Sequence, residues 1–316
     1  MIARLILGRC VSALVTLIAI SIIVFAMVQM LPGDVASMVL GRFASETAKE
    51  ALRQQLHLYQ PAAWRYLGWL AGLLTGNLGD DLSSQQPIAV IIAPALGNTL
   101  VLSGAALAIY LPLTLSVAGV QAFYRYGGID HGLSTVTMIG ASIPEFLMSI
   151  LFLVMFVVVM PVLPAVSFVD EHTSFIGWLS ALALPAVVLA IVMSVYGIRM
   201  LRGNLIEILQ SDFIQVALLR GLSPGRVLIR HALPNALIPT LNVTALNLGY
   251  LIGGVVVVEK VFAFPGFGSL MVDAVSFRDV PLVEATVMIA AAIYVASNLV
   301  ADLMAIVLNP KLRRTS

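Results

Sequence analysis

Long runs of apolar residues recur along this chain, separated by shorter segments that carry most of the charges. A helix needs about 20 consecutive apolar residues to cross the hydrocarbon core of a bilayer, and these runs are long enough. The third run is interrupted by Pro144-Glu145-Phe146, which divides it into a weak and a strong half. The pattern predicts six transmembrane helices, over residues 7–30, 96–123, 133–162, 179–200, 236–258 and 282–308.

Two polar segments divide the chain into parts. We expect the N-terminus with the first helix, then a polar region outside the membrane, then a five-helix core, and finally a short tail. The core contains the second polar segment, a loop over residues 206–235. The four parts have the ranges 1–31, 32–95, 96–308 and 309–316.

The polar region after the first helix carries two helix signals. Residues 45–58 begin with Ser45-Glu46-Thr47-Ala48-Lys49-Glu50, which predicts a capped amphipathic helix. Trp64, Tyr66 and Trp69 follow closely. Aromatic residues gather where lipid meets water, so this stretch is expected to lie along the membrane interface.

Composition agrees with a membrane protein. The chain is 60% hydrophobic and 10% charged, with a mean hydropathy of +1.02, whereas soluble domains carry about 25% charged residues. Its net charge of +1 provides no basic field for nucleic acid. Cys10 is the only cysteine and the four histidines are scattered, so neither a disulfide within the chain nor a metal site is indicated. We therefore expect an all-α polytopic membrane protein.

The distribution of Lys and Arg predicts the orientation. Of the 17 basic residues, 11 fall on the side of the N-terminus if six helices cross the membrane. Basic residues are enriched in cytoplasmic segments, so both termini and the 206–235 loop are expected in the cytoplasm. The region at 32–95 is then periplasmic.

The 206–235 loop contains the signals of two short helices. Asp212 can cap the first helix, with Gln215 completing a capping box. Gly221 is placed to end that helix in a left-handed conformation. Ser223 is expected to cap the second helix, with Pro224 at its first position. The first helix would expose Phe213, Val216 and Leu218, an apolar face that suits a groove on a soluble partner.

At this loop the sequence resembles bacterial ABC-importer permeases. Their cytoplasmic signature is E-A-A, three residues, G, nine residues and I-x-L-P. Here Gln215-Val216-Ala217 is followed, at the same spacing, by Gly221 and by His231-Ala232-Leu233-Pro234. The sequence departs from the signature at Gln215, Val216 and His231.

The rest of the chain is similar to the dipeptide, oligopeptide and nickel group of these permeases. The long polar region after the first helix resembles the first permease subunit of the pair. The matching segments are Leu31-Pro32-Gly33-Asp34, Leu56-His57-Leu58-Tyr59-Gln60-Pro61, Gly76-Asn77-Leu78-Gly79, Asn98-Thr99-Leu100, Glu259-Lys260-Val261-Phe262, Pro265-Gly266-Phe267-Gly268, Arg278-Asp279-Val280-Pro281 and Asn309-Pro310-Lys311-Leu312-Arg313.

The resemblance implies a six-helix type I importer permease in the bacterial inner membrane. It implies three kinds of partner besides membrane lipid: a second homologous permease subunit, two cytoplasmic ATPase subunits, and a periplasmic or lipoprotein substrate-binding protein. ATP and Mg²⁺ would bind the ATPase subunits. No cofactor is expected in this chain, which contains no Walker lysine loop.

Candidate site residues follow from the loop, the membrane depth and the outer motifs. The residues expected to couple the chain to the ATPase subunits are Asp212, Gln215, Ala217, Gly221, Leu222, Ser223, Arg226, Leu233 and Pro234. Those expected along the translocation pathway are Glu145, Ser142, Met148 and Asn247. A carboxylate at membrane depth is costly and usually marks a pathway or an ion pair, so Glu145 could contact a cationic substrate group or a second subunit. The residues expected at a periplasmic gate or docking surface are Glu259, Pro265, Gly266, Arg278 and Asp279.

Two other function classes stay open at this point. An ion-coupled secondary transporter would share the hydropathy, although it would not need the two-helix loop. An intramembrane enzyme would need a reactive constellation, and the sequence contains neither Gly-x-Ser-x-Gly nor His-Glu-x-x-His. The substrate is left open between peptides, nickel, opines and oligosaccharides.

Overall fold

The computed structural model describes residues 2–30, 37, 44–55, 58–164, 166–167, 174–237, 240 and 255–308. Over these residues the regular structure is helical, and the pairing between Asp80 and Pro87 is an isolated bridge. The expectation of an all-α membrane protein is confirmed.

Four helices in the described ranges are long and apolar enough to cross a membrane. They correspond to the first, second, fourth and sixth predicted spans. Their bounds are α1 (Ile2–Gln29), α5 (Ile88–Phe123), α8 (Phe175–Leu209) and α13 (Val280–Leu308).

Two helices continue beyond the apolar windows that predicted them. Residues 88–95 were assigned to the polar region, but they form the first turns of α5. Residues 206–209 were assigned to the loop, but they end α8. At 1.5 Å per residue, α5 is about 54 Å long, whereas the hydrocarbon core is about 30 Å thick. Hydropathy detects only the part of a helix that lies in lipid.

The third predicted span is sharply bent. α6 (Gly128–Ser142) and α7 (Glu145–Leu153), which continues into the π-helical η1 (Val154–Val159), meet at an angle of 103°. Pro144 disfavours a helical conformation at the preceding residue, and Ile143 is extended, with a ψ angle of 120°. The described chain thus has four spans, or five if the bent pair is one span. The fifth predicted span, 236–258, lies mostly outside the described residues.

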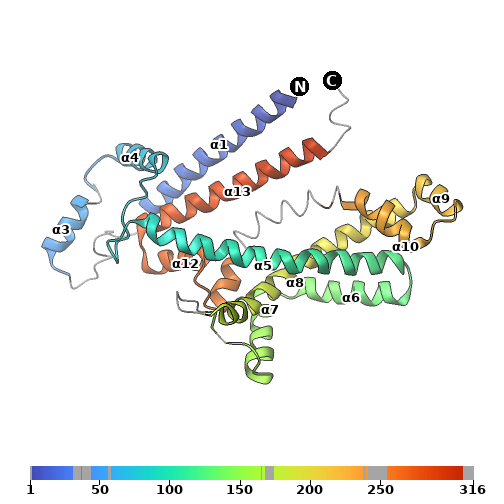
Figure 1. The fold of residues 1–316 in the computed structure, drawn as a ribbon. Coiled ribbons are helices and arrows are strands. Elements are labelled where there is room, and N and C mark those ends of the chain that lie inside the picture. Colours follow the sequence, from blue (N-terminus) through green and yellow to red (C-terminus); the bar gives the residue numbers. More distant parts are fainter. Residues whose placement is uncertain are drawn as a thin grey trace.

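The long helices pack in two pairs. α5 packs against α8, and α1 packs against α13 with the opposite chain direction (Figure 1). Buried side chains from α5, α8 and residues 255–264, among them Tyr110, Leu189 and Phe262, form the central core.

The polar region contains two of the expected helices. α3 (Glu46–Gln55) begins after Ser45, whose side-chain oxygen accepts a hydrogen bond from the backbone N of Ala48, so the predicted cap is confirmed. α4 (Ala62–Thr75) packs on α1 through Tyr66, whose ring contacts Phe25 edge to face. Its position at a membrane interface stays a prediction.

The two ends of α5 carry different short helices. At its start, Ile88 and Ile92 pack with α12 (Phe267–Phe277) and the first turns of α13. At its end, Ala118 and Ala122 pack with α9 (Asp212–Leu219) and α10 (Pro224–Val227). We call these regions the α12 end and the α9 end, and they lie at opposite ends of α5 in Figure 1. The 30 residues from Ile92 to Ala122 correspond to about 45 Å of helix.

Candidate functional site

The first helix of the predicted coupling loop starts one residue earlier than its expected cap implies. Ser211 is the N-cap residue, and Asp212 is the first helical residue. The Gln215 side chain donates to the backbone oxygen of Leu209, 3.4 Å away, and closes no capping box. The predicted Asp212–Gln215 capping box is therefore wrong. Ser211 occupies the N-cap position, but its hydroxyl donates to the backbone oxygen of Ile208 and caps no N–H of α9.

The connection between the two short helices agrees with the prediction. Gly221 has a φ angle of +85°, the left-handed conformation that favours glycine. Ser223 occupies the N-cap of α10 and Pro224 its first position, although the serine side chain accepts no capping hydrogen bond. Leu222, between them, packs against the buried cluster at the α9 end.

α9 has one face in the core and one in solvent. Ile214 is fully buried, and Ala217 packs beside it against residues of α5 and α8. Phe213 and Val216 are about half exposed, and Leu219 is 87% exposed. An unpartnered apolar face on a short projecting helix is suited to a groove on another protein.

The chain that leaves α10 widens into the π-helical η2 (Leu228–Ala232). The backbone N of Leu233 bonds to the oxygen of Leu228, five residues back, and Pro234 follows with no N–H to donate. Leu233 faces the buried cluster, whereas Pro234 and Arg226 are exposed. A cavity of about 310 Å³ between the last turns of α5 and this segment is lined by Leu115, Ser116, Gly119, Val120, Phe123, Tyr124, Gly225, Leu228, Ile229 and Leu233.

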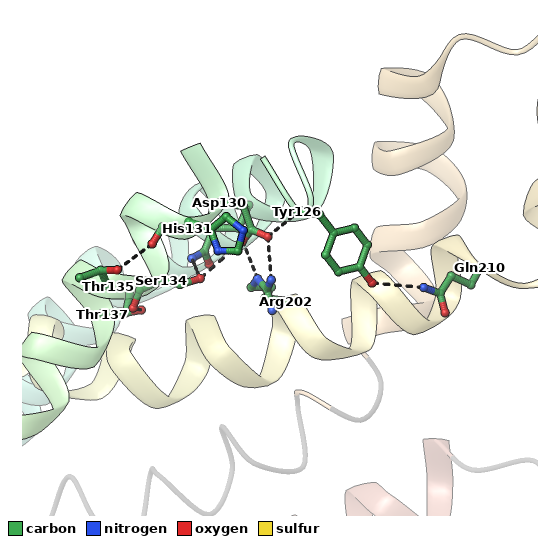
Figure 2. Close-up of polar contacts among 9 residues, drawn as sticks. Tyr126, Asp130, His131, Ser134, Thr135, Thr137, Arg202 and Gln210 are labelled. Carbon is green, nitrogen blue, oxygen red and sulfur yellow. Dashed lines mark hydrogen bonds and ion pairs between the residues drawn. The ribbon is translucent and has the colours of Figure 1, made fainter. Parts of the chain in front are cut away.

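A buried ion pair lies at the same end of the molecule (Figure 2). Asp130, in the first turn of α6, is fully buried. The Nε and a terminal nitrogen of Arg202 in α8 donate to its two carboxylate oxygens, each at 2.7 Å. The backbone N of Tyr126 also donates to this carboxylate, at 2.9 Å.

Sequence analysis missed this pair. Arg202 was used only for the orientation, and Asp130 was not considered. The only signal was one acidic and one basic residue at the margins of apolar helices, where unpaired charges are costly.

The outer motifs meet at the α12 end. Glu259 is fully buried, and the Thr99 hydroxyl of α5 donates to its carboxylate at 2.5 Å. The Thr99 oxygen accepts from the backbone N of Phe267 at 2.8 Å, and the Glu259 carboxylate accepts from the backbone N of Ser269 at 2.8 Å. Two free N–H groups in the first turn of α12 are thereby satisfied by side chains from other elements. The side chain of Asn98 adds a hydrogen bond to the Pro265 oxygen, at 2.8 Å.

Gly266 completes this arrangement because only hydrogen fits at its α-carbon. A Cβ there would lie 2.0 Å from Oε1 of Glu259. The described chain between Glu259 and Phe277 is therefore a tight turn followed by α12. Segments that were separate in the sequence, at 98–100, 259–262 and 265–268, form one contact site.

Asp279 anchors a second connection at this end. Its carboxylate accepts hydrogen bonds from the backbone N of Leu282 at 3.0 Å, which caps α13, and from the backbone N of Leu82 at 2.6 Å. Burial, together with the neighbouring Asp81 carboxyl, raises the pKa of Asp279 to about 6. Arg278, one residue earlier, ends α12 with a φ angle of +58°.

The pathway candidates do not gather in one described cavity. Ser142 is the last residue of α6 and Glu145 the first of α7, so both lie at the 103° bend. Met148 packs in the central core. Asn247 lies outside the described residues. A role in translocation stays a prediction for all four.

Comparison with known proteins extends over the whole chain. Residues 110–314 match the family described as "Binding-protein-dependent transport system inner membrane component". Residues 1–118 match the N-terminal family of the same transport systems.

Individual relatives align along nearly their full lengths. A Brucella melitensis protein, provisionally described as a peptide transport system permease protein, is 34% identical over 99% of both chains. A "Probable peptide ABC transporter permease protein" of Sinorhizobium fredii is 33% identical over 98% of both. The "Glutathione transport system permease protein" of Pectobacterium atrosepticum is 33% identical over 96% of this chain and 97% of its own. The chain therefore belongs to the family of inner-membrane components of binding-protein-dependent transport systems, as permease subunits of ABC importers.

Proposed function

We propose that this chain and a second homologous permease subunit form the membrane path of an ATP-driven importer for peptides or similar small solutes. The peptide class rests on the names of the relatives, which include peptide and glutathione permeases. As a transport permease, the chain is not itself an enzyme, and ATP is hydrolysed by separate subunits.

One observation supports the coupling role above all others. The α9 helix projects an apolar face from the end of the helix bundle, while its other face is built into the core. The exposed face, with Phe213, Val216 and Leu219, fits into a groove on an ATPase subunit. Because Ile214 is packed against α5 and α8, a displacement of α9 moves those long helices instead of being absorbed in a loop.

Alternating access would follow from this connection. When the ATPase subunits close around ATP, their grooves move and carry α9 with them. The long helices are then levered against those of the second permease subunit, which exchanges access between the two faces of the membrane. In this proposal both termini and the α9 end face the cytoplasm, and the α12 end faces the binding protein.

A substitution on the exposed face of α9 tests the proposal. Leu219→Glu places a charge on a side chain that is 87% exposed, so the fold of this chain should tolerate it. We expect at least a tenfold loss of ATPase subunits that copurify with the permease pair, and a similar loss of ATP-driven uptake in proteoliposomes.

Phe277→Glu is the matched control, because Phe277 is 72% exposed and lies at the end of α12. It should leave copurification of the ATPase subunits unchanged. If Leu219→Glu retained them at the wild-type level, α9 would not be the contact, and the proposal would be wrong.

A further inference from the structure

The Asp130–Arg202 ion pair joins α6 to α8 through two hydrogen bonds to a buried carboxylate. One guanidinium donates to both carboxylate oxygens of a side chain that has no exposed surface. Bidentate pairs of this kind fix direction as well as distance. The backbone N of Tyr126 occupies a further acceptor position, so the carboxylate is held from two sides.

The pair joins the element that carries α9 to the bent segment. Arg202 lies seven residues before Leu209, the last residue of α8, which is about 10 Å of helix. Asp130 stands in the first turn of α6, and α6 leads directly to the bend at residues 143–144. The pair therefore links the end of α8 that leads to α9 with the start of α6 (Figure 2).

Away from the pair, α6 also touches α5 and α8 through uncharged contacts. Gln121 of α5 donates to the hydroxyl of Ser134 at 3.1 Å, and Ser134 lies one turn beyond Asp130. Farther along, α6 approaches α8 closely enough that a Cβ on Gly140 would meet a methyl group of Val195 at 3.4 Å. These contacts are neutral and weak individually. The ion pair is the one charged link between α6 and α8 in the described residues.

We propose that the Asp130–Arg202 pair acts as a permanent clamp that makes α6 move together with α8, so that motion of α9 reaches the bend between α6 and α7. The clamp rests on the proposed coupling function of α9. It assigns a positioning role to both residues: they carry the movement to the segment that holds Glu145 and Ser142, without contacting substrate or ATP.

A clamp that transmits motion should be separable from assembly. Asp130→Asn keeps the size of the side chain and an acceptor for the N–H of Tyr126, but removes the charge that holds Arg202. We expect the ATPase subunits to copurify and to hydrolyse ATP, while uptake per ATP hydrolysed falls at least tenfold. Asp130→Glu, which retains a carboxylate, should recover part of this ratio.

A covalent replacement distinguishes a permanent clamp from a contact that opens in each cycle. Cys10 is the only cysteine of this chain, so Cys10→Ser leaves the chain without thiols of its own. In that background, Asp130→Cys with Arg202→Cys should transport poorly until a short bifunctional thiol reagent joins the two cysteines. Uptake per ATP should then return to within twofold of the Cys10→Ser parent.

Three results would overturn the clamp. In the first, Asp130→Asn has an unchanged ratio of uptake to hydrolysis. In the second, cross-linking arrests uptake, which would mean that the contact must open. In the third, both Asp130→Asn and the milder Arg202→Lys fail to assemble, which would make the pair a requirement for folding. All three differ from failure of the coupling proposal itself, in which Leu219→Glu would retain its ATPase subunits.

Discussion

The two ends of α5 both bury a carboxylate, but they satisfy it in different ways. At the α12 end, Glu259 accepts hydrogen bonds from the Thr99 hydroxyl and the backbone N of Ser269. At the α9 end, Asp130 accepts two from the guanidinium of Arg202. Glu259 receives both hydrogen bonds only when α5, α12 and its own segment are all in place. At the α9 end, one bidentate arginine side chain joins two helices, α6 and α8.

The two ends also differ in why each needs a glycine. Gly266 is needed for space, because Glu259 occupies the position where a Cβ would be. Gly221 is needed for conformation, because its φ angle is +85° while nothing lies within 4 Å of a built Cβ. The chain is thus tightly packed around Gly266 at the α12 end, whereas the turn at Gly221 lies in open surroundings. We infer that the α12 end is the fixed side of the molecule and the α9 end the side that moves.

Gly266→Ala is expected to have the largest effect on stability. The new methyl group must displace Glu259, which combines overpacking with the loss of buried hydrogen-bond partners. The expected destabilisation is about 4 kcal/mol or more, enough to remove assembled protein from the membrane. The measurement is the amount of folded protein after detergent extraction.

Gly104→Ala is the control for this substitution. Gly104 lies within α5, and no atom lies within 4 Å of its built Cβ. Alanine also favours helix over glycine by about 1 kcal/mol. The variant should accumulate normally. Equal losses in both variants would show that an added methyl group is rejected whatever its surroundings, and the special packing of the α12 end would be refuted.

The next expected effect is a pH dependence located at the α12 end. The pKa of Asp279 is raised by burial from 3.8 to about 6, so the folded state binds this proton more tightly than the unfolded state. Its contribution to stability is therefore fully present below about pH 4 and is lost as the pH rises to about 6. The loss is at most about 3 kcal/mol across that window.

Thermal unfolding of the purified protein between pH 4 and pH 8 measures this effect. Asp279→Asn keeps an acceptor for the N–H of Leu282 but does not titrate. The wild-type midpoint should fall relative to the variant between pH 4 and pH 6, and the two curves should run parallel above pH 6. Parallel curves over the whole range would show that titration of Asp279 does not affect stability.

A smaller effect is expected from Thr99→Val. The Thr99 hydroxyl links the N–H of Phe267 to the Glu259 carboxylate, so its removal leaves both without this partner. The expected loss is about 1–3 kcal/mol in the free energy of unfolding. Thr114→Val is the control on the same helix, because the buried hydroxyl of Thr114 has no hydrogen-bond partner among the described residues. If the two variants unfolded alike, the link through Thr99 would contribute nothing.

The fold was predictable where a local pattern determines it. Apolar runs located α1, α5, α8 and α13, and Pro144 marked the break in the third span. Helix ends were less predictable, because α5 and α8 continue past the apolar window that hydropathy measures. The count of six spans depends on residues outside the described ranges.

The site was predictable only in its local parts. The turn at Gly221 and the Ser223-Pro224 start are set by neighbouring residues and could be inferred from them. Ser211 occupies the N-cap position instead of Asp212, although both residue types favour that position. The long-range partners are separated by 72 residues for Asp130 and Arg202, and by 160 for Thr99 and Glu259, so no local pattern predicts them.

Gly221→Ala is expected to have the smallest effect on stability, and it tests the α9 end directly. The left-handed conformation costs a residue with a Cβ about 1–2 kcal/mol, and the open surroundings add no clash. The protein should therefore assemble, with a small fall in its unfolding midpoint. Because α9 and α10 would meet at a strained turn, uptake per ATP hydrolysed should fall further than stability does. Gly221→Asn should be milder in both measurements, since asparagine tolerates this conformation better. If uptake instead fell only in proportion to the amount of folded protein, the geometry of this turn would have no role in coupling beyond holding the chain together.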